Sequence, residues 1–167
     1  MKTTTTVTSN FRCSLERAFK TPILGDATKI HTGYGFMPPV THFTKDETWG
    51  KPGGDRIVYS AKNSFYKEGE SALDTVIDRV DNRYWKWVVS DFRQWSMGFT
   101  KFQGEWFVED NKDGTIAIKY VYTLFSKNIL AYPFHWFLTK VLWNGYMEHA
   151  MQNIKTLAET EAPYIYQ

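Results

Sequence analysis

The chain has 167 residues, 43% of them hydrophobic, which is enough for one substantial core and short for two, so we predict a single domain over residues 1–167. Its 20 Lys and Arg residues are spread among 18 Asp and Glu residues, and a formal charge of +2 without a basic run argues against a nucleic-acid-binding surface. Aromatic residues make up 17% of the chain. A small domain with so many rings either packs them in its core or lines a cavity with them.

Cysteine and histidine usage narrows the function classes further. Cys13 is the single cysteine, so no disulfide framework is expected. The four histidines, at positions 31, 42, 135 and 149, lie far apart without metal-ligand spacing, and we expect no metal or other cofactor. The Thr-rich N-terminal segment does not have the apolar core of a secretory signal, and no apolar run approaches the ~20 residues of a membrane span. We therefore expect a cytoplasmic location.

The N-terminal third predicts one strand followed by two short helices. Residues 2–13 are dense in Thr and Val, which favours a strand. Ser14 and Asp26 can cap helices over residues 15–20 and 27–31, which Pro22 and Gly33 would end. Residues 33–39 read Gly-Tyr-Gly-Phe-Met-Pro-Pro, and because the prolines preclude a following helix, a mobile or partner-facing loop is favoured over a phosphate-binding one.

Residues 40–126 predict about six strands joined by tight turns, because apolar and polar residues alternate between Gly, Asn and Asp clusters. Two strands have a clear inward face, and the last one is apolar on both faces, so that its inward face stays open. The predicted strands cover residues 40–49, 56–61, 72–80, 84–90, 99–109 and 115–126. The predicted inward residues of the fourth and fifth of these are Trp85, Trp87 and Val89, then Phe102, Gly104, Trp106 and Val108.

Residues 133–159 predict one long helix, since Pro133 fits its first turn and good helix formers follow without another proline. At 100° per residue, one apolar seam is expected to face the interior, and a second apolar stripe lies on roughly the opposite side. The seam contains Trp136, Trp143, Met147, Ala150 and Ile154, and the stripe contains Phe134, Phe137, Leu138, Val141 and Gly145.

The second stripe needs a cover of its own, and the sequence leaves three candidates. The loop over residues 33–39 is one. The others are contacts with partners: a homodimer or a transient membrane contact through Phe134, Phe137, Leu138 and Val141.

The element order predicts an α+β protein whose antiparallel sheet is covered by the terminal helix. This order resembles the helix-grip superfamily, also called SRPBCC, from Lys2 to about Leu157, and in particular its polyketide cyclase/dehydrase-like family; START domains and birch-pollen-allergen-like proteins are other members. The local features are the short helices after strand one, Gly104-Glu105-Trp106-Phe107-Val108-Glu109 before an Asp113-Gly114-Thr115 hairpin, and the helix after Ser126. The resemblance implies a curved sheet of about seven strands wrapped round the long helix, with a cavity for an apolar ligand between them. No catalytic motif of the family is matched residue by residue.

We therefore expect binding or carriage of a small hydrophobic ligand, such as a lipid, a sterol or a polyketide-like compound, in a cavity between the sheet and the C-terminal helix. Two alternatives stay open: a cyclase or dehydratase that uses Tyr146 or His149 for proton transfer, and a non-enzymatic interaction protein whose core is filled by rings. An inward pair of carboxylates, Asp74 and Asp78, is a further candidate. The residues predicted to line the cavity are Trp87, Phe102, Trp106, Tyr120, Tyr122, Trp136, Trp143 and Met147.

Overall fold

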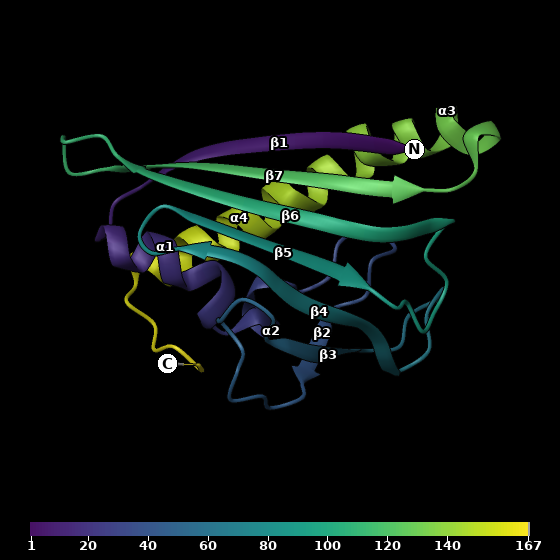
Figure 1. Ribbon diagram of the computed structural model, residues 1–167, viewed down its shortest axis with the longest axis horizontal. Helices are drawn as coiled ribbons and strands as arrows, with labels where there is room; N and C mark the ends of the chain where they lie inside the picture. Colours follow the sequence, from purple (N-terminus) through teal and green to yellow (C-terminus); the bar gives the residue numbers. More distant parts are fainter. Residues whose placement is uncertain (167) are drawn as a thin grey trace.

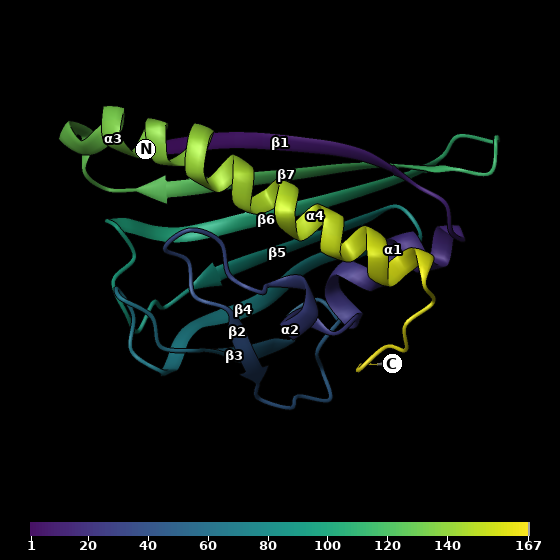
Figure 2. The same ribbon diagram turned by 180° about the vertical axis from the view of Figure 1, so that it is seen from behind.

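Seven antiparallel strands form one curved sheet in the order β1-β7-β6-β5-β4-β3-β2 (Figure 1). The computed structural model describes residues 1–166, without the side chain at position 129. The C-terminal helix lies diagonally across one face of the sheet, here called the inner face (Figure 2). The strands are β1 (Lys2–Phe11), β2 (Val40–Phe43), β3 (Asp55–Ser60), β4 (Gly69–Val80), β5 (Tyr84–Ser90), β6 (Phe99–Asp110) and β7 (Ile116–Ser126). The predicted α+β helix-grip architecture is confirmed.

The period-two pattern predicts the inner face of β5 and β6 correctly. Trp85 and Trp87 are buried on β5, and the alternate residues from Phe102 to Val108 are buried on β6. The question left open for β7 is now settled, because Ile116, Ile118, Tyr120, Tyr122 and Leu124 are all buried. These side chains form one continuous core with the C-terminal helix.

Helix α1 (Leu15–Leu24) runs past Pro22, so the prediction that this proline ends the helix at residue 20 is wrong. Proline has no N–H and leaves the carbonyl four residues earlier, that of Ala18, without its helical donor. The indole Nε1 of Trp106 donates to this carbonyl at 3.0 Å. The sheet thus supplies the missing hydrogen bond, and the helix continues. Helix α2 (Ala27–Ile30) follows as predicted.

The C-terminal helix is divided into segments of different pitch. After a 3₁₀ turn (Ile129–Ala131), α3 spans Tyr132–Phe137, a π-helical segment spans Leu138–Trp143, and α4 spans Asn144–Glu159. A π turn contains one residue more than an α turn, and each such insertion rotates everything upstream by about 100°. The seam predicted for a regular helix therefore holds only after the insertion.

The prediction that Trp136 faces the interior is wrong for this reason. Trp143, Met147, Ala150 and Ile154 are buried as predicted, but Trp136 is 49% exposed. The inward place upstream of the π segment is occupied by His135, which lies eight residues before Trp143 instead of seven.

The second apolar stripe is covered only in part. Leu138 is buried, and the residue 33–39 loop covers the far end of the stripe, where the Tyr34 ring lies over Gly145. Phe134, Phe137 and Val141 remain about half exposed. The loop is therefore one cover of the stripe, and the front of the stripe faces outward.

A glycine in β6 permits a close approach of two inner-face residues. A Cβ built on Gly104 would lie 2.3 Å from two atoms of the Trp87 indole, so only a hydrogen fits at this position. The two residues are register partners on β5 and β6. Gly104 thus fixes where the Trp87 ring lies.

We predict that Gly104→Ala destabilises the protein by about 1–3 kcal/mol, because the added methyl group overpacks the core and displaces Trp87. Gln103→Ala, on the opposite face of the same strand, is the matched control. The measurement is urea unfolding of both variants and the wild type. Equal unfolding midpoints for the two variants would contradict the close approach.

Candidate functional site

A cavity of about 130 Å³ lies between the inner face of the sheet and the C-terminal helix. The loops over residues 33–39, 61–68 and 91–98 form its rim, through residues such as Met37, Tyr66 and Trp95. Most of its wall is aromatic or aliphatic, but four polar side chains of interest also line it. These are His31, Arg56, Asp74 and Tyr146.

The structure separates the eight predicted lining residues into three groups. Trp87, Phe102, Tyr122 and Trp143 line the cavity. Trp106, Tyr120 and Met147 are packed in the core instead. Trp136 lies outside, because the π-helical segment turns it away from the interior. The aromatic side chains therefore have both roles that the composition suggested: some fill the core, and others form the wall of the cavity.

Arg56 and Asp74 form a buried ion pair at the cavity wall. They are register partners on β3 and β4, and Arg56 Nη2 and Nε lie 3.1 and 3.3 Å from Asp74 Oδ2. Only 4% of Arg56 and 7% of Asp74 is exposed. The guanidinium also stacks between two rings, 3.7 Å from the Phe43 centroid and 3.6 Å from that of Trp49. This packing holds the cation in place away from water.

Two polar atoms of this pair have no hydrogen-bond partner among residues 1–166: Arg56 Nη1 and Asp74 Oδ1. Burial raises the pKa of the Asp74 carboxyl, and the neighbouring Arg56 charge opposes that rise. A buried polar atom that stays unpaired costs on the order of 1–3 kcal/mol. One donor and one acceptor of the pair are therefore left without a partner at a mostly apolar wall.

The candidate pair of inward carboxylates, Asp74 and Asp78, does not form, because a bulge separates the two residues. The β4–β5 register shifts between Val76 and Asp78, so Asp74 points inward whereas Asp78 is exposed. The inward partner of Asp74 is Arg56, which the sequence analysis missed. One signal was available in the sequence of β3, where Arg56, Val58 and Ser60 alternate with Ile57 and Tyr59. Arg56, Val58 and Ser60 are all buried, so Arg56 lies on the inward face of the strand.

His31 and Tyr146 form a second polar pair at the same cavity. Tyr146 Oη lies 2.6 Å from His31 Nδ1. Burial, and secondly the Arg56 charge, lower the pKa of His31 to about 4, so its imidazole is neutral at pH 7. Burial, with the Asp74 charge adding to it, raises the pKa of the Tyr146 hydroxyl. Both groups are therefore uncharged under ordinary conditions.

Of the two residues proposed for proton transfer, only Tyr146 lines the cavity. His149 turns away from it, and its Nε2 lies 2.8 Å from the Thr32 hydroxyl. Tyr146 is therefore the candidate of the two that the structure leaves at the cavity. Within the described part of the chain, no group of three or more His, Cys, Asp or Glu side chains has a geometry suited to a metal ion.

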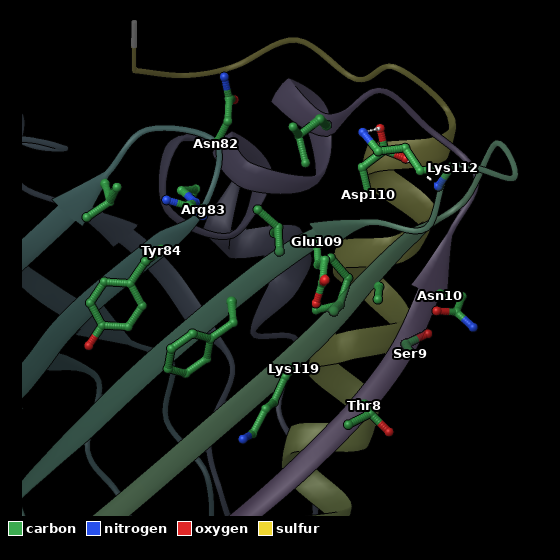
Figure 3. Close-up of a pocket in the computed structure, with 16 residues that line it drawn as sticks. Thr8, Ser9, Asn10, Asn82, Arg83, Tyr84, Glu109, Asp110, Lys112 and Lys119 are labelled. Atoms are coloured by element: carbon green, nitrogen blue, oxygen red, sulfur yellow. Dashed lines mark hydrogen bonds and ion pairs between the residues drawn. The ribbon is translucent and has the colours of Figure 1, made fainter.

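A wider depression on the outer face of the sheet is not a comparable site (Figure 3). The polar residues labelled there, from Thr8 on β1 to Arg83 and Lys119, are all exposed or half-exposed. Lys112 pairs with Asp110 at 3.3 Å in open solvent. Exposed charges of this kind are well solvated, so the buried cavity is the stronger candidate.

A sheet wrapped round a long C-terminal helix, with a cavity between them, is the helix-grip fold. Solved structures confirm this. The chain is similar to Ara h 8.0201, with 15% identity over 96% of this chain and 99% of that one and a TM-score of 0.71. It is also similar to a Thalictrum norcoclaurine synthase, with 12% identity over 98% of both chains and a TM-score of 0.67.

A third similar structure is the di-domain ARO/CYC protein StfQ from the steffimycin biosynthetic pathway, with 10% identity and a TM-score of 0.68. The match covers 97% of this chain and 52% of StfQ. No protein-family model matches the chain, and no curated protein does so. At these identities the likeness establishes the fold. Among the described residues, no helix is long and apolar enough to cross a membrane.

The pKa of His31 predicts a pH-dependent contribution to stability. The ordinary pKa of a histidine is 6.5, and the pKa of His31 in the folded protein is about 4. Between these two pH values the unfolded chain binds a proton at His31 and the folded protein does not. The free energy of unfolding therefore falls as the pH is lowered through this window. We predict that His31→Gln, which keeps a hydrogen-bond acceptor for Tyr146, loses less stability between about pH 7 and about pH 4.5 than the wild type.

Urea unfolding at both pH values measures this difference, and His42→Gln, at an exposed position, is the control. An identical loss of stability in wild type and His31→Gln would show that His31 is not desolvated in the folded state.

Proposed function

We propose that the chain binds a small hydrophobic ligand, about one aromatic ring in size and carrying a hydroxyl or amide group, in the cavity between the sheet and the C-terminal helix. The observation that carries this proposal is the buried Arg56–Asp74 pair at a ring-lined wall. A hydroxyl or amide both accepts and donates hydrogen bonds, so it complements the free Nη1 of Arg56 and the free Oδ1 of Asp74.

The cavity volume favours a ring over a larger ligand. Sites for drug-sized molecules typically hold about 300–1,000 Å³, whereas this cavity holds about 130 Å³. An apolar cavity of about 150 Å³ is sufficient for benzene. A sterol or a long acyl chain would have to displace several wall rings. Among the ligand classes expected from the sequence, the fit is therefore best for a phenolic, polyketide-like ring.

The ion pair also argues against a merely filled core. Removing two charges from water costs several kcal/mol each, and well-packed apolar residues usually replace a buried pair at no loss of stability. A core under selection for stability alone gains nothing from leaving Arg56 Nη1 and Asp74 Oδ1 unpaired. Recognition of a polar group explains why they are there.

Filling the cavity should abolish binding. Ala72 is buried and lines the cavity, so Ala72→Leu places three more carbon atoms in the ligand's space. We predict that this variant binds phenol at least about tenfold more weakly than the wild type, measured by ligand-detected NMR titration. The control is Ala117→Leu, at a half-exposed position on the outer face of β7. Unchanged phenol binding by Ala72→Leu would place the ligand elsewhere.

Removing both charges together should change selectivity without unfolding the protein, because an apolar replacement of the whole pair is often neutral or stabilising. We predict that the double variant Arg56→Met, Asp74→Leu binds toluene about as well as the wild type but loses about tenfold of its preference for phenol over toluene. NMR titrations with the two probes measure this preference. If the double variant keeps it, the pair does not recognise the polar group.

Acid–base catalysis on the same ligand is a second candidate. The observation that favours it is the His31–Tyr146 pair, in which a neutral imidazole lies 2.6 Å from a phenol hydroxyl at the cavity wall. Such a pair can relay a proton to or from a bound ring. The similar norcoclaurine synthase is an enzyme, so this fold can accommodate catalysis.

A further inference from the structure

Large apolar side chains are exposed together at one end of the molecule. Leu130 is 89% exposed, and five further residues between positions 132 and 141 are 41% to 52% exposed. We call this the α3 surface, consisting of Leu130, Tyr132, Phe134, Trp136, Phe137 and Val141. Exposed apolar residues normally occur singly on a soluble protein, and a contiguous group marks an interaction site.

The structure holds this face outward through polar contacts on the opposite side of the helix. His135 is buried and its Nε2 donates to the Met97 carbonyl at 2.9 Å. Thr139 is buried as well, with its hydroxyl 2.6 Å from that of Thr3 on β1. The usual arrangement of a surface helix is therefore inverted, with polar residues inside and rings outside. The π segment produces this inversion, so the exposure is built into the fold.

The net charge around the α3 surface is positive. The sequence contains no acidic residue between Asp113 and Glu148, while Lys127 and Lys140 are both exposed. The adjacent strand β1 contributes Lys2 and no carboxylate, and Lys140 Nζ reaches it by donating to the Thr4 carbonyl at 2.6 Å. The β5–β6 loop adds one charge of each sign, Asp91 and Arg93.

This combination selects between the two partners left open by the sequence. A symmetric homodimer would bring the same lysines of two copies together without carboxylates to pair with them. Anionic lipid headgroups complement these lysines, and Trp and Tyr are the side chains that prefer the membrane interface. We propose that the α3 surface docks onto anionic lipid bilayers, with its rings inserted at headgroup depth.

The docking surface is connected to the ligand cavity. The His135–Met97 hydrogen bond joins α3 to the loop over residues 91–98, whose Phe92, Trp95 and Met97 line the cavity. Figure 2 shows α3 beyond the end of β7, at the same end of the molecule as this loop. A docked bilayer thus lies beside one wall of the cavity, where a membrane-partitioning ring compound would be concentrated.

The test is cosedimentation of the full chain with phosphatidylcholine vesicles, with and without about one third phosphatidylserine. We expect binding to the anionic vesicles, weakened about tenfold or more in the double variant Trp136→Ser, Phe137→Ser and about fivefold in Lys127→Gln. These side chains are exposed, so the fold should survive, and urea unfolding checks this. Ile77→Ser, which removes an exposed apolar residue from β4, should bind like the wild type.

Three results would overturn the proposal. One is no binding to either vesicle, and another is equal binding to neutral and anionic vesicles. The third is a wild-type dimer in light scattering that the Trp136, Phe137 double variant converts to a monomer, which would assign the α3 surface to a second copy of the chain.

Discussion

Hydrogen bonds from tryptophan indoles of the sheet region to carbonyls of α1 hold the inner layer of this fold together. Trp106 donates to Ala18 and Trp85 to Phe19, at 3.0 and 2.6 Å, and Trp49 donates to Ile23 at 2.9 Å. The Trp106 indole replaces the helical donor lost at Pro22, and all three indoles anchor α1 to the sheet region. Three of the seven tryptophans are thereby used to close one end of the space under the C-terminal helix. The cavity lies toward the opposite end, where loops form the rim.

The sequence predicted the order of the elements and most inner faces because hydrophobic periodicity persists along an uninterrupted strand or helix. It failed where a single residue is inserted. The bulge between Val76 and Asp78 turns Asp78 outward, and the π segment turns Trp136 outward. Pro22 was misjudged for a related reason, since its compensating donor comes from Trp106, 84 positions further along the chain. None of these effects leaves a local pattern that a sequence reader can detect.

The candidate site, too, was predicted from the sequence only in part. Trp87, Phe102, Tyr122 and Trp143 were found from the sequence because large rings on an inward face are expected to surround any cavity there. The Arg56–Asp74 pair was not found, because a charged residue in an alternating strand is assigned to solvent by default. The free-energy cost of burying the Arg56 charge is offset by Asp74, its register partner on the next strand. Strand register depends on tertiary structure, so the sequence pattern of one strand does not reveal it.

The π segment links the cavity to the exposed rings. With a regular helix, Trp136 and Trp143 would lie on one inward line, and His135 would point elsewhere. The additional residue keeps Trp143 at the cavity wall and places His135 where its Nε2 reaches the Met97 carbonyl of a cavity loop. The same rotation leaves Trp136 and Phe137 facing outward. One local change in helical pitch therefore shapes a cavity wall on one side and an apolar surface on the other, so a change in that pitch would alter both.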